Sequence, residues 1–333
     1  MAKAKITGIG ASVPDKVLTN ADLEKMVETT DDWITSRTGI KERRILAEGE
    51  RISDHCVKAA KEALDRAGAS PDDLDLIINA TFTADYVLPS GACLIQDKLG
   101  VTRDVPAFDL AAACSGFVYG LETASHFIAS GNYKKILVIG ADALSRFTNW
   151  ADRATCVLFG DGAGAAVVEP ADDPSIGILS ADLGAAGRHH DILKVEGGSS
   201  FMPGPCLLTD ASLKDKYYIT MEGNSLFKIV TRLVADSVLR AIEKAGLKPS
   251  DISYFVPHQA NIRIIDYVAE KLKMPREKVA VTIRKYGNNS AASVPVALYD
   301  CLKEGKIKKG DLVVFTAFGS GLTYASMVVR WAY

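Results

Sequence analysis

Three residues stand out because their side chains suit acyl-transfer chemistry: Cys114, His258 and Asn288. Cys114 lies in the segment FDLAAACSGF, where an apolar strand and small residues lead into a helix predicted to begin near Ser115. The free N–H groups and dipole of a helix N-terminus favour a thiolate by roughly 0.3–1 kcal/mol, so we expect an activated nucleophile. The other cysteines are interpreted as fillers of the apolar core: Cys56, Cys93, Cys156, Cys206 and Cys301.

His258 and Asn288 each follow a strand or turn and precede a predicted helix, in the segments YFVPHQAN and YGNNSAASVP. Taken alone, His258 also suits a structural histidine, and Asn288 also suits a helix cap. Beside a thiol, however, an imidazole and an amide supply neutral donors for a developing oxyanion. Acyl transfer through a thioester requires that combination.

An internal repeat connects the three positions. Residues 63–80 align without gaps with residues 241–258, and residues 114–135 align with residues 288–309. The second alignment makes Cys114 and Asn288 equivalent, and His258 falls at the end of a repeated strand, where parallel strands usually carry ligands. A pseudo-two-fold axis between the repeats would bring these residues towards the centre of the molecule.

The elements that position these residues alternate between strands and helices. Apolar runs such as KITGIG, LDLIINA and KILVIGA alternate with helical patterns over residues 52–67, 91–99 and 114–130. This alternation indicates an α/β protein with helices packed on a largely parallel sheet. The segment EPADDPS breaks the periodicity, so we predict an N-terminal half, residues 1–170, with the cysteine, and a C-terminal half, residues 171–333, with the histidine and asparagine.

Composition narrows the possible functions. The chain has 333 residues, 48% of them hydrophobic, and a formal charge of −2, which is ordinary globular composition. An apolar run that stops at Glu122 is too short to span a bilayer, and no export leader is visible. We therefore expect a soluble, cytoplasmic protein that does not bind a membrane. The sequence has no block of basic residues of the kind that indicates nucleic-acid binding. The spacing of the cysteines and histidines predicts neither a metal site nor a disulfide framework.

Several segments together carry a resemblance to a known family: AAACSGF, VPHQAN, YGNNSAASVP, DDWITSRTGI, FGDGAGA, MEGN and AFGSG. Through them the whole chain resembles β-ketoacyl-acyl carrier protein synthase III of the thiolase superfamily. The resemblance implies a homodimer with a duplicated, five-layered αβαβα fold. It also implies a decarboxylating condensation of an acyl-CoA primer with malonyl-acyl carrier protein, which initiates type II fatty-acid synthesis. In this ping-pong reaction Cys114 takes the acyl group, and His258 and Asn288 assist decarboxylation. Acyl-CoA is a substrate, and no cofactor is expected.

The resemblance also implies where coenzyme A binds. Trp33, Arg37, Arg153 and Asn224 would contact it. A tryptophan ring offers a face for the adenine, and guanidinium groups suit its phosphates.

An oxyanion hole is implied for the backbone N–H groups of Cys114 and Ser320. The family usually has three consecutive glycines where this chain has Gly319, Ser320 and Gly321. A positive φ at Ser320 would therefore be strained.

The implied acyl pocket contains Leu88, Phe159 and Phe318. Leu88 stands where acetyl-preferring relatives carry a phenylalanine that reaches across the dimer. Because a leucine leaves more room, and each buried CH₂ contributes about 0.8 kcal/mol, we expect branched or longer primers to be accepted alongside acetyl-CoA.

The carrier protein is acidic, so a local basic patch should attract it, with Arg263 at the centre. The implied docking residues are Gln259, Ala260, Asn261, Ile262, Arg263 and Lys271.

Three alternatives stay open at this point. The order Cys, His, Asn is also that of papain-like cysteine proteases, although a CGSCW-like segment is absent. A thiolase-fold binding protein without catalysis is disfavoured because all three reactive side chains are present. A related thiolase-fold synthase of secondary metabolism would use the same chemistry.

Overall fold

Two mixed β-sheets form the framework of the protein. The computed structural model describes residues 3–200 and 215–333. The larger sheet has the order β1-β7-β6-β4-β5: β1 (Ala4–Ser12), β7 (Asp161–Pro170), β6 (Ile136–Ala143), β4 (Leu76–Ala80) and β5 (Ala107–Leu110). The smaller has the order β8-β13-β12-β11: β8 (Gly177–Ala185), β13 (Thr323–Arg330), β12 (Leu312–Gly319) and β11 (Tyr254–Pro257). Two short pairs join β2 (Val17–Thr19) to β3 (Glu42–Arg44), and β9 (Leu193–Lys194) to β10 (Thr220–Met221).

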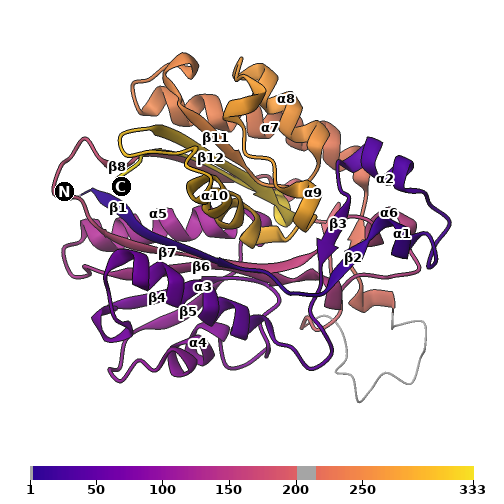
Figure 1. The fold of residues 1–333 in the computed structure, drawn as a ribbon, viewed down its shortest axis with the longest axis horizontal. Coiled ribbons are helices and arrows are strands. Elements are labelled where there is room, and N and C mark those ends of the chain that lie inside the picture. The colour runs from indigo at the N-terminus through magenta and orange to yellow at the C-terminus, as the bar shows by residue number, and fades with distance from the viewer. Residues whose placement is uncertain (1–2, 201–214) are drawn as a thin grey trace.

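Helices and sheets are stacked in five layers (Figure 1). The outer face of the larger sheet carries α3 (Ile52–Ala67) and α4 (Gly91–Leu99). Between the sheets lie α5 (Gly116–Ala129) and α10 (Ser293–Lys303), and the far face of the smaller sheet carries α7 (Gly223–Lys244) and α8 (Ile262–Lys271). Within the described residues, four short α-helices complete the set: α1 (Asn20–Leu23), α2 (Asp31–Thr38), α6 (Arg153–Cys156) and α9 (Ile283–Tyr286). The expected αβαβα fold is confirmed.

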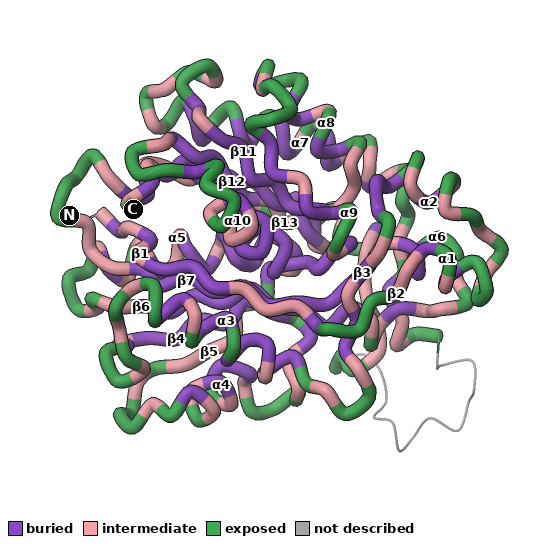
Figure 2. Tube along the Cα trace, in the orientation of Figure 1, coloured by how far each residue is buried: buried purple, intermediate pink, exposed green. Residues whose placement is uncertain are grey.

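Burial follows from this layering. Strands β4, β6 and β12 are buried along their whole length, because helices cover both faces of each sheet. Figure 2 shows the buried residues concentrated in the two sheets and in the helices between them. Phe117 and Leu121 of α5 pack in one core with Phe315 and Met327 of the smaller sheet. Residues at the ends of these strands are therefore attached to a closely packed core.

The two sheets share one connectivity. In the larger, β4 and β6 are parallel while β6, β7 and β1 are antiparallel neighbours; in the smaller, β11 and β12 are parallel while β12, β13 and β8 are antiparallel neighbours. The aligned turns also agree, since Gly68 after α3 and Gly246 after α7 have φ values of 64° and 72°. Each is followed by a short 3₁₀ turn that begins with proline, Pro71–Asp73 or Pro249–Asp251.

The expectation of a largely parallel sheet is wrong. Antiparallel pairs make up half of the pairings in the larger sheet. The connection from β6 to β7 contains a 3₁₀ turn, Leu144–Arg146, and the four-residue helix α6, so no long crossover helix intervenes and β7 returns antiparallel to β6. Within residues 3–200 and 215–333, no helix combines the length and apolarity needed to cross a bilayer.

Candidate active site

Cys114 lies on a tight 3₁₀ turn, Ala113–Ser115, directly before α5. Ala113 has a φ of 47°, a conformation that residues other than glycine rarely adopt, and Ser290, which begins the corresponding 3₁₀ turn before α10, has a similar φ of 51°. The two halves therefore share a 3₁₀ turn before the central helix, with Cys114 inside its turn and Asn288 two residues before the other. A Cβ on Gly319 would lie 2.5 Å from the Cys114 backbone nitrogen, so only glycine lets β12 approach the nucleophile so closely.

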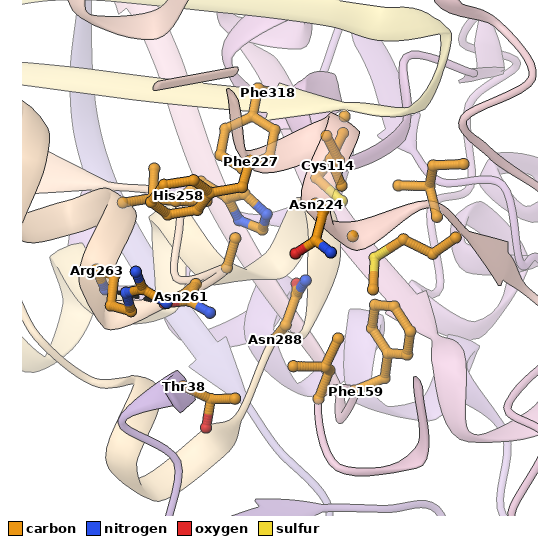
Figure 3. Close-up of a pocket in the computed structure, with 18 of the residues that line it drawn as sticks. Thr38, Cys114, Phe159, Asn224, Phe227, His258, Asn261, Arg263, Asn288 and Phe318 are labelled. Atoms are coloured by element: carbon orange, nitrogen blue, oxygen red, sulfur yellow. Dashed lines mark hydrogen bonds between the residues drawn. The ribbon is translucent and has the colours of Figure 1, made fainter. Parts of the chain in front are cut away.

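The three predicted catalytic side chains meet in one cavity of about 430 Å³ (Figure 3). Cys114, His258 and Asn288 are 8%, 3% and 7% exposed, and they reach the cavity from the 3₁₀ turn before α5, the end of β11 and the turn after α9. The structure thus brings together the residues that the internal repeat placed at equivalent strand and helix ends. Among the described residues, no group of three or more His, Cys, Asp or Glu side chains is placed to hold a metal ion.

The Cys114 thiol is held in its neutral form by burial. Burial raises its pKa from 9.0 to about 12; the Asp142 carboxylate adds to this rise, and a hydrogen bond donated by the Ser290 hydroxyl, 3.2 Å from Sγ, opposes it. Each pKa unit corresponds to about 1.4 kcal/mol, so burial outweighs the ~0.3–1 kcal/mol of a helix dipole. The expectation of a dipole-activated thiolate in the free protein is therefore wrong.

Sequence reasoning missed Asp142 and Ser290, which lie behind the nucleophile. Asp142 in β6 is fully buried, and its Oδ1 accepts hydrogen bonds from the hydroxyls of Thr81 and Thr83 at 3.0 and 2.8 Å. Burial raises the pKa of this carboxyl group above its ordinary value. No local pattern marks these residues, because β4, β6 and the turn after Asn288 meet only in the folded chain.

His258 is a neutral imidazole with one ring nitrogen already engaged. Its Nδ1 lies 2.5 Å from the Ser293 hydroxyl, and its ring meets that of Phe318 edge-on, with 5.3 Å between centroids. Burial lowers the pKa of His258 from 6.5 to about 3. The ring is therefore uncharged at neutral pH.

Asn288 is fixed by its backbone, which leaves the amide nitrogen for the cavity. Its N–H donates to the Leu158 carbonyl at 2.9 Å, and its carbonyl accepts from Gly160 at 3.0 Å. Its Oδ1 accepts from the Ser290 N–H at 3.0 Å. Within the described residues Nδ2 makes no hydrogen bond, and Figure 3 shows the amide pointing into the cavity.

We expect the decarboxylation of a malonyl thioester to show no break near the ordinary histidine pKa of about 6.5. The folded-state pKa of His258 is about 3. Protonation of the ring therefore begins only as the pH approaches this value, well below the ordinary histidine pKa. The rate, measured from about pH 5.5 to about pH 8, should stay level through this range. A single-proton loss of rate centred near pH 6.5, absent from the His258→Gln variant, would contradict the neutral ring.

Trp33, Arg37 and Arg153 form a stacked group at the mouth of the cavity. The Arg37 and Arg153 guanidinium carbons lie 4.9 and 4.8 Å from the centre of the Trp33 ring. Arg37 and Asn224 line the cavity itself, whereas Trp33 lies next to it through its contact with Arg37, and Arg153 stacks on the same Trp33 ring. An adenine that stacks on Trp33 must share the ring with a guanidinium group or displace it.

A second cavity, of about 370 Å³, meets the first at Cys114, Phe159 and Leu193. Its walls are mostly apolar and come from separate segments that no sequence motif connects: Phe82, Ala111, Leu144, Leu193, Val195 and Ile219. Ser320 and Gly321 also line it. A positive φ of 121° falls on Gly321 and not on Ser320, so the strain expected at the serine does not arise. The Ser320 hydroxyl donates a hydrogen bond to the Leu193 carbonyl.

The three predicted acyl-pocket residues are placed differently. Phe159 lines both cavities, while Phe318 lines the first and packs on His258. Leu88 is 87% exposed and lies outside both cavities of its own chain, on a loop where Val87 is also exposed.

The predicted carrier-docking residues also separate. Ala260, Asn261 and Arg263 line the cavity, Ile262 is half-buried beside Gly39, and Lys271 lies at the other end of α8. Docking by Gln259 is contradicted, since this side chain is 1% exposed. Its Nε2 donates to the carbonyls of Pro257 and Ala280, and its Oε1 accepts from the backbone of Thr282 and Ile283. Gln259 therefore anchors the chain beneath the site.

The remaining cysteines mostly match their interpretation as core residues. Cys56, Cys156 and Cys301 are buried. Cys93 is exposed, so the prediction for it is wrong: α4 lies on the surface and turns this position towards solvent. Cys206 lies outside the described residues.

Comparisons with known proteins agree with this geometry. Residues 108–187 match the family model described as 3-oxoacyl-[acyl-carrier-protein (ACP)] synthase III, and residues 242–331 match that of its C-terminal part. The β-ketoacyl-[acyl-carrier-protein] synthase III of Natranaerobius thermophilus is 50% identical over 333 residues, covering 99% of this chain and 100% of that protein. The chain belongs to the β-ketoacyl-[acyl-carrier-protein] synthase III family.

Solved structures of related proteins share the whole fold. The 3-oxoacyl-[acyl-carrier-protein] synthase III of Aquifex aeolicus superposes with a TM-score of 0.90 at 48% identity, covering 98% of this chain and 100% of that one. The priming β-ketosynthase of the R1128 polyketide pathway superposes with a TM-score of 0.92 at 33% identity, covering 99% and 97%. This synthase III chain is thus an acyl-transferring condensing enzyme of fatty-acid synthesis with the thiolase fold. A papain-like protease is excluded.

Proposed function

We propose that the enzyme condenses an acyl-CoA primer with malonyl-acyl carrier protein by a ping-pong mechanism on Cys114. One observation carries the proposal: a single buried thiol lies where a cavity with a cationic mouth meets an apolar cavity. The cavity with the cationic mouth suits a phosphopantetheine arm whose phosphate end lies at the mouth, and the apolar cavity suits an acyl chain. The substrate itself, and no cofactor, brings the acyl group.

In the first half-reaction the Cys114 sulfur attacks the thioester carbonyl of acyl-CoA. The bond from Cys114 Sγ to the acyl carbon forms, the bond to the coenzyme A sulfur breaks, and the thiol proton leaves with coenzyme A. The backbone N–H groups of Cys114 and Ser320 would hold the developing oxyanion. Trp33, Arg37, Arg153 and Asn224 would hold coenzyme A at the mouth.

In the second half-reaction malonyl-acyl carrier protein enters through the same cavity. His258 Nε2 and Asn288 Nδ2 donate hydrogen bonds to its thioester oxygen, so that carbon dioxide leaves and the electron pair remains as an enolate. The enolate carbon attacks the acyl carbon on Cys114, the Cys114 thiolate leaves, and a solvent proton restores the thiol. The product is a β-ketoacyl-acyl carrier protein.

The test of this function uses the intact protein and its two substrates separately. After exposure to a panel of acyl-CoAs, mass spectrometry should show one added acyl group that hydroxylamine removes. The acylated protein should then consume malonyl-acyl carrier protein with release of carbon dioxide. A protein that gains no acyl group from any acyl-CoA would refute the ping-pong mechanism.

Charge reversal at Arg263 should weaken carrier docking. Arg263 is exposed, stacks on Phe227 at 5.1 Å and lines the cavity entrance, so Arg263→Glu places a negative charge where an acidic carrier protein approaches. We expect the apparent KM for malonyl-acyl carrier protein to rise about tenfold and that for acyl-CoA to change much less. Added salt should reproduce the effect in the wild type.

A second substitution on the same helix serves as the comparison. Lys271 lies about 12 Å further along α8, so Lys271→Glu should raise the carrier KM less than Arg263→Glu does. An unchanged carrier KM for Arg263→Glu at low ionic strength would remove Arg263 from the docking surface.

Leu88 should set the depth of the acyl pocket through a second copy of the chain. Val87 and Leu88 form an exposed apolar tip, which fits burial in a homodimer. In competition among acetyl-, isobutyryl- and hexanoyl-CoA, the native enzyme should use all three. Leu88→Phe should lose the longer primers by roughly fourfold for each methylene excluded. Strict acetyl selectivity in both proteins would show that this position does not limit the pocket.

A synthase of secondary metabolism is the second candidate, because the R1128 priming ketosynthase shares the fold. Its identity of 33% is lower than the 48% of the Aquifex enzyme, which favours fatty-acid synthesis.

A further inference from the structure

The Ser293 hydroxyl is the hydrogen-bond partner of the His258 ring. Both side chains are buried, and Ser293 Oγ lies 2.5 Å from His258 Nδ1. Ser293 is the first residue of α10, so the rigid helix between the sheets fixes its position. The backbone of His258 is fixed as well, since its N–H donates to the Thr316 carbonyl at 2.7 Å.

The hydrogen bonds around Ser293 show which atom carries the proton between these two groups. The Gln259 N–H, 3.4 Å away, donates to Ser293 Oγ. Among the described residues, the only acceptor within reach of the Ser293 hydroxyl proton is His258 Nδ1. If Nδ1–H donated to Oγ instead, the serine would accept twice and its own buried proton would lack a partner, which typically costs about 1–3 kcal/mol.

We infer that Ser293 is a positioning residue that fixes His258 in the tautomer with its proton on Nε2. This inference rests on the proposed role of His258 in malonyl decarboxylation and assigns the origin of its donor. With Nδ1 accepting from Ser293, the ring hydrogen is on Nε2, and His258 lines the same cavity as Asn288 (Figure 3). Two neutral N–H donors then point at one oxygen.

The same tautomer excludes His258 as the base that takes the Cys114 proton. An Nε2 that carries a hydrogen has no lone pair for the thiol. Ser293 therefore assigns His258 to the decarboxylation half-reaction, and the Cys114 proton must leave with coenzyme A. Loss of the Ser293 hydroxyl should affect one half-reaction and spare the other.

The first test reads the tautomer directly in the full-length protein without substrate. Long-range ¹H–¹⁵N NMR with ¹⁵N-labelled histidine distinguishes protonated from unprotonated ring nitrogens, and His258→Gln identifies the signal among the five histidines. We expect Nε2 protonated and Nδ1 unprotonated at neutral pH. A ring protonated on Nδ1 in the wild type overturns the inference, whether or not any variant folds.

The second test separates the half-reactions. Ser293→Ala should mix the tautomers and slow malonyl decarboxylation at least about tenfold, with Cys114 acylation unchanged. Ser293→Thr keeps the hydroxyl and should keep the Nε2–H tautomer. Ser237→Ala, which removes another buried hydroxyl in α7, should leave both half-reactions unchanged.

The outcomes are decisive in both directions. Equal slowing of acylation and decarboxylation by Ser293→Ala, or no slowing of decarboxylation, overturns the role of Ser293. A threonine variant with the tautomer mixture of the alanine variant does the same. A wild-type protein that takes no acyl group would refute the proposed function and leave the tautomer measurement standing.

Discussion

Cys114→Ala should gain no acyl mass from any acyl-CoA, whereas the wild type should gain one acyl group. The expected loss in condensation rate is on the order of 10⁴-fold or more, because the variant lacks the thiol that forms the covalent intermediate where the two cavities meet. Cys114 is the cysteine, among the described residues, that lines both cavities. Intact-mass spectrometry and a condensation assay measure the two losses.

Two matched cysteine variants make the result specific. Cys156→Ala removes a buried thiol that lines neither cavity, and Cys93→Ala removes the thiol that is exposed among the described cysteines and so open to unspecific acylation. Both should be acylated like the wild type. A thioester on Cys114→Ala that persists when Cys93 is also replaced would show that the nucleophile is another residue.

The same variant separates the two half-reactions. Cys114→Ala keeps His258 and Asn288, so it should still decarboxylate a malonyl thioester. Released carbon dioxide without a condensed product is the expected signature. Complete loss of decarboxylation in a folded Cys114→Ala protein would mean that the thiol takes part in forming the enolate.

Much of the candidate site could be predicted from sequence because it follows the repeat. Cys114 lies on the 3₁₀ turn before α5, Asn288 lies two residues before the matching turn at the start of α10, and His258 directly follows a repeated strand. The helices α3 and α4 begin and end where their apolar patterns do. Periodicity does not encode strand direction, so the antiparallel return of β7 was missed.

The rest of the site depends on contacts between distant segments. Ser290 contacts the thiol across 176 positions of sequence, and no pattern of spacing predicts that contact. In the sequence, Gln259 is a polar residue beside His258 and suits a surface position. In the structure its side-chain amide makes hydrogen bonds with four backbone groups. The thiol pKa was misjudged for the same reason, since burial arises only when the layers pack.

Asn288→Ala should slow malonyl decarboxylation by about 10²–10³-fold and leave Cys114 acylation largely intact. Removal of one donor to a developing oxyanion typically has this cost. The asymmetry follows from geometry: Asn288 Nδ2 points into the first cavity, whereas the acyl chain would lie in the second cavity, which Asn288 does not line. Carbon dioxide release and acyl-enzyme mass measure the two steps.

Asn288→Asp distinguishes loss of the donor from loss of the side chain. The carboxylate keeps an oxygen to accept the Ser290 N–H, so the turn before α10 stays in place, but it replaces the N–H donor with a negative charge beside the enolate oxygen. Decarboxylation should therefore fall at least as far as in Asn288→Ala. Asn289→Ala removes the neighbouring buried amide, which lines neither cavity among the described residues, and should keep both steps. If Asn288→Asp decarboxylates as fast as the wild type, or if acylation falls as much as decarboxylation, Asn288 does not stabilise the enolate as a hydrogen-bond donor.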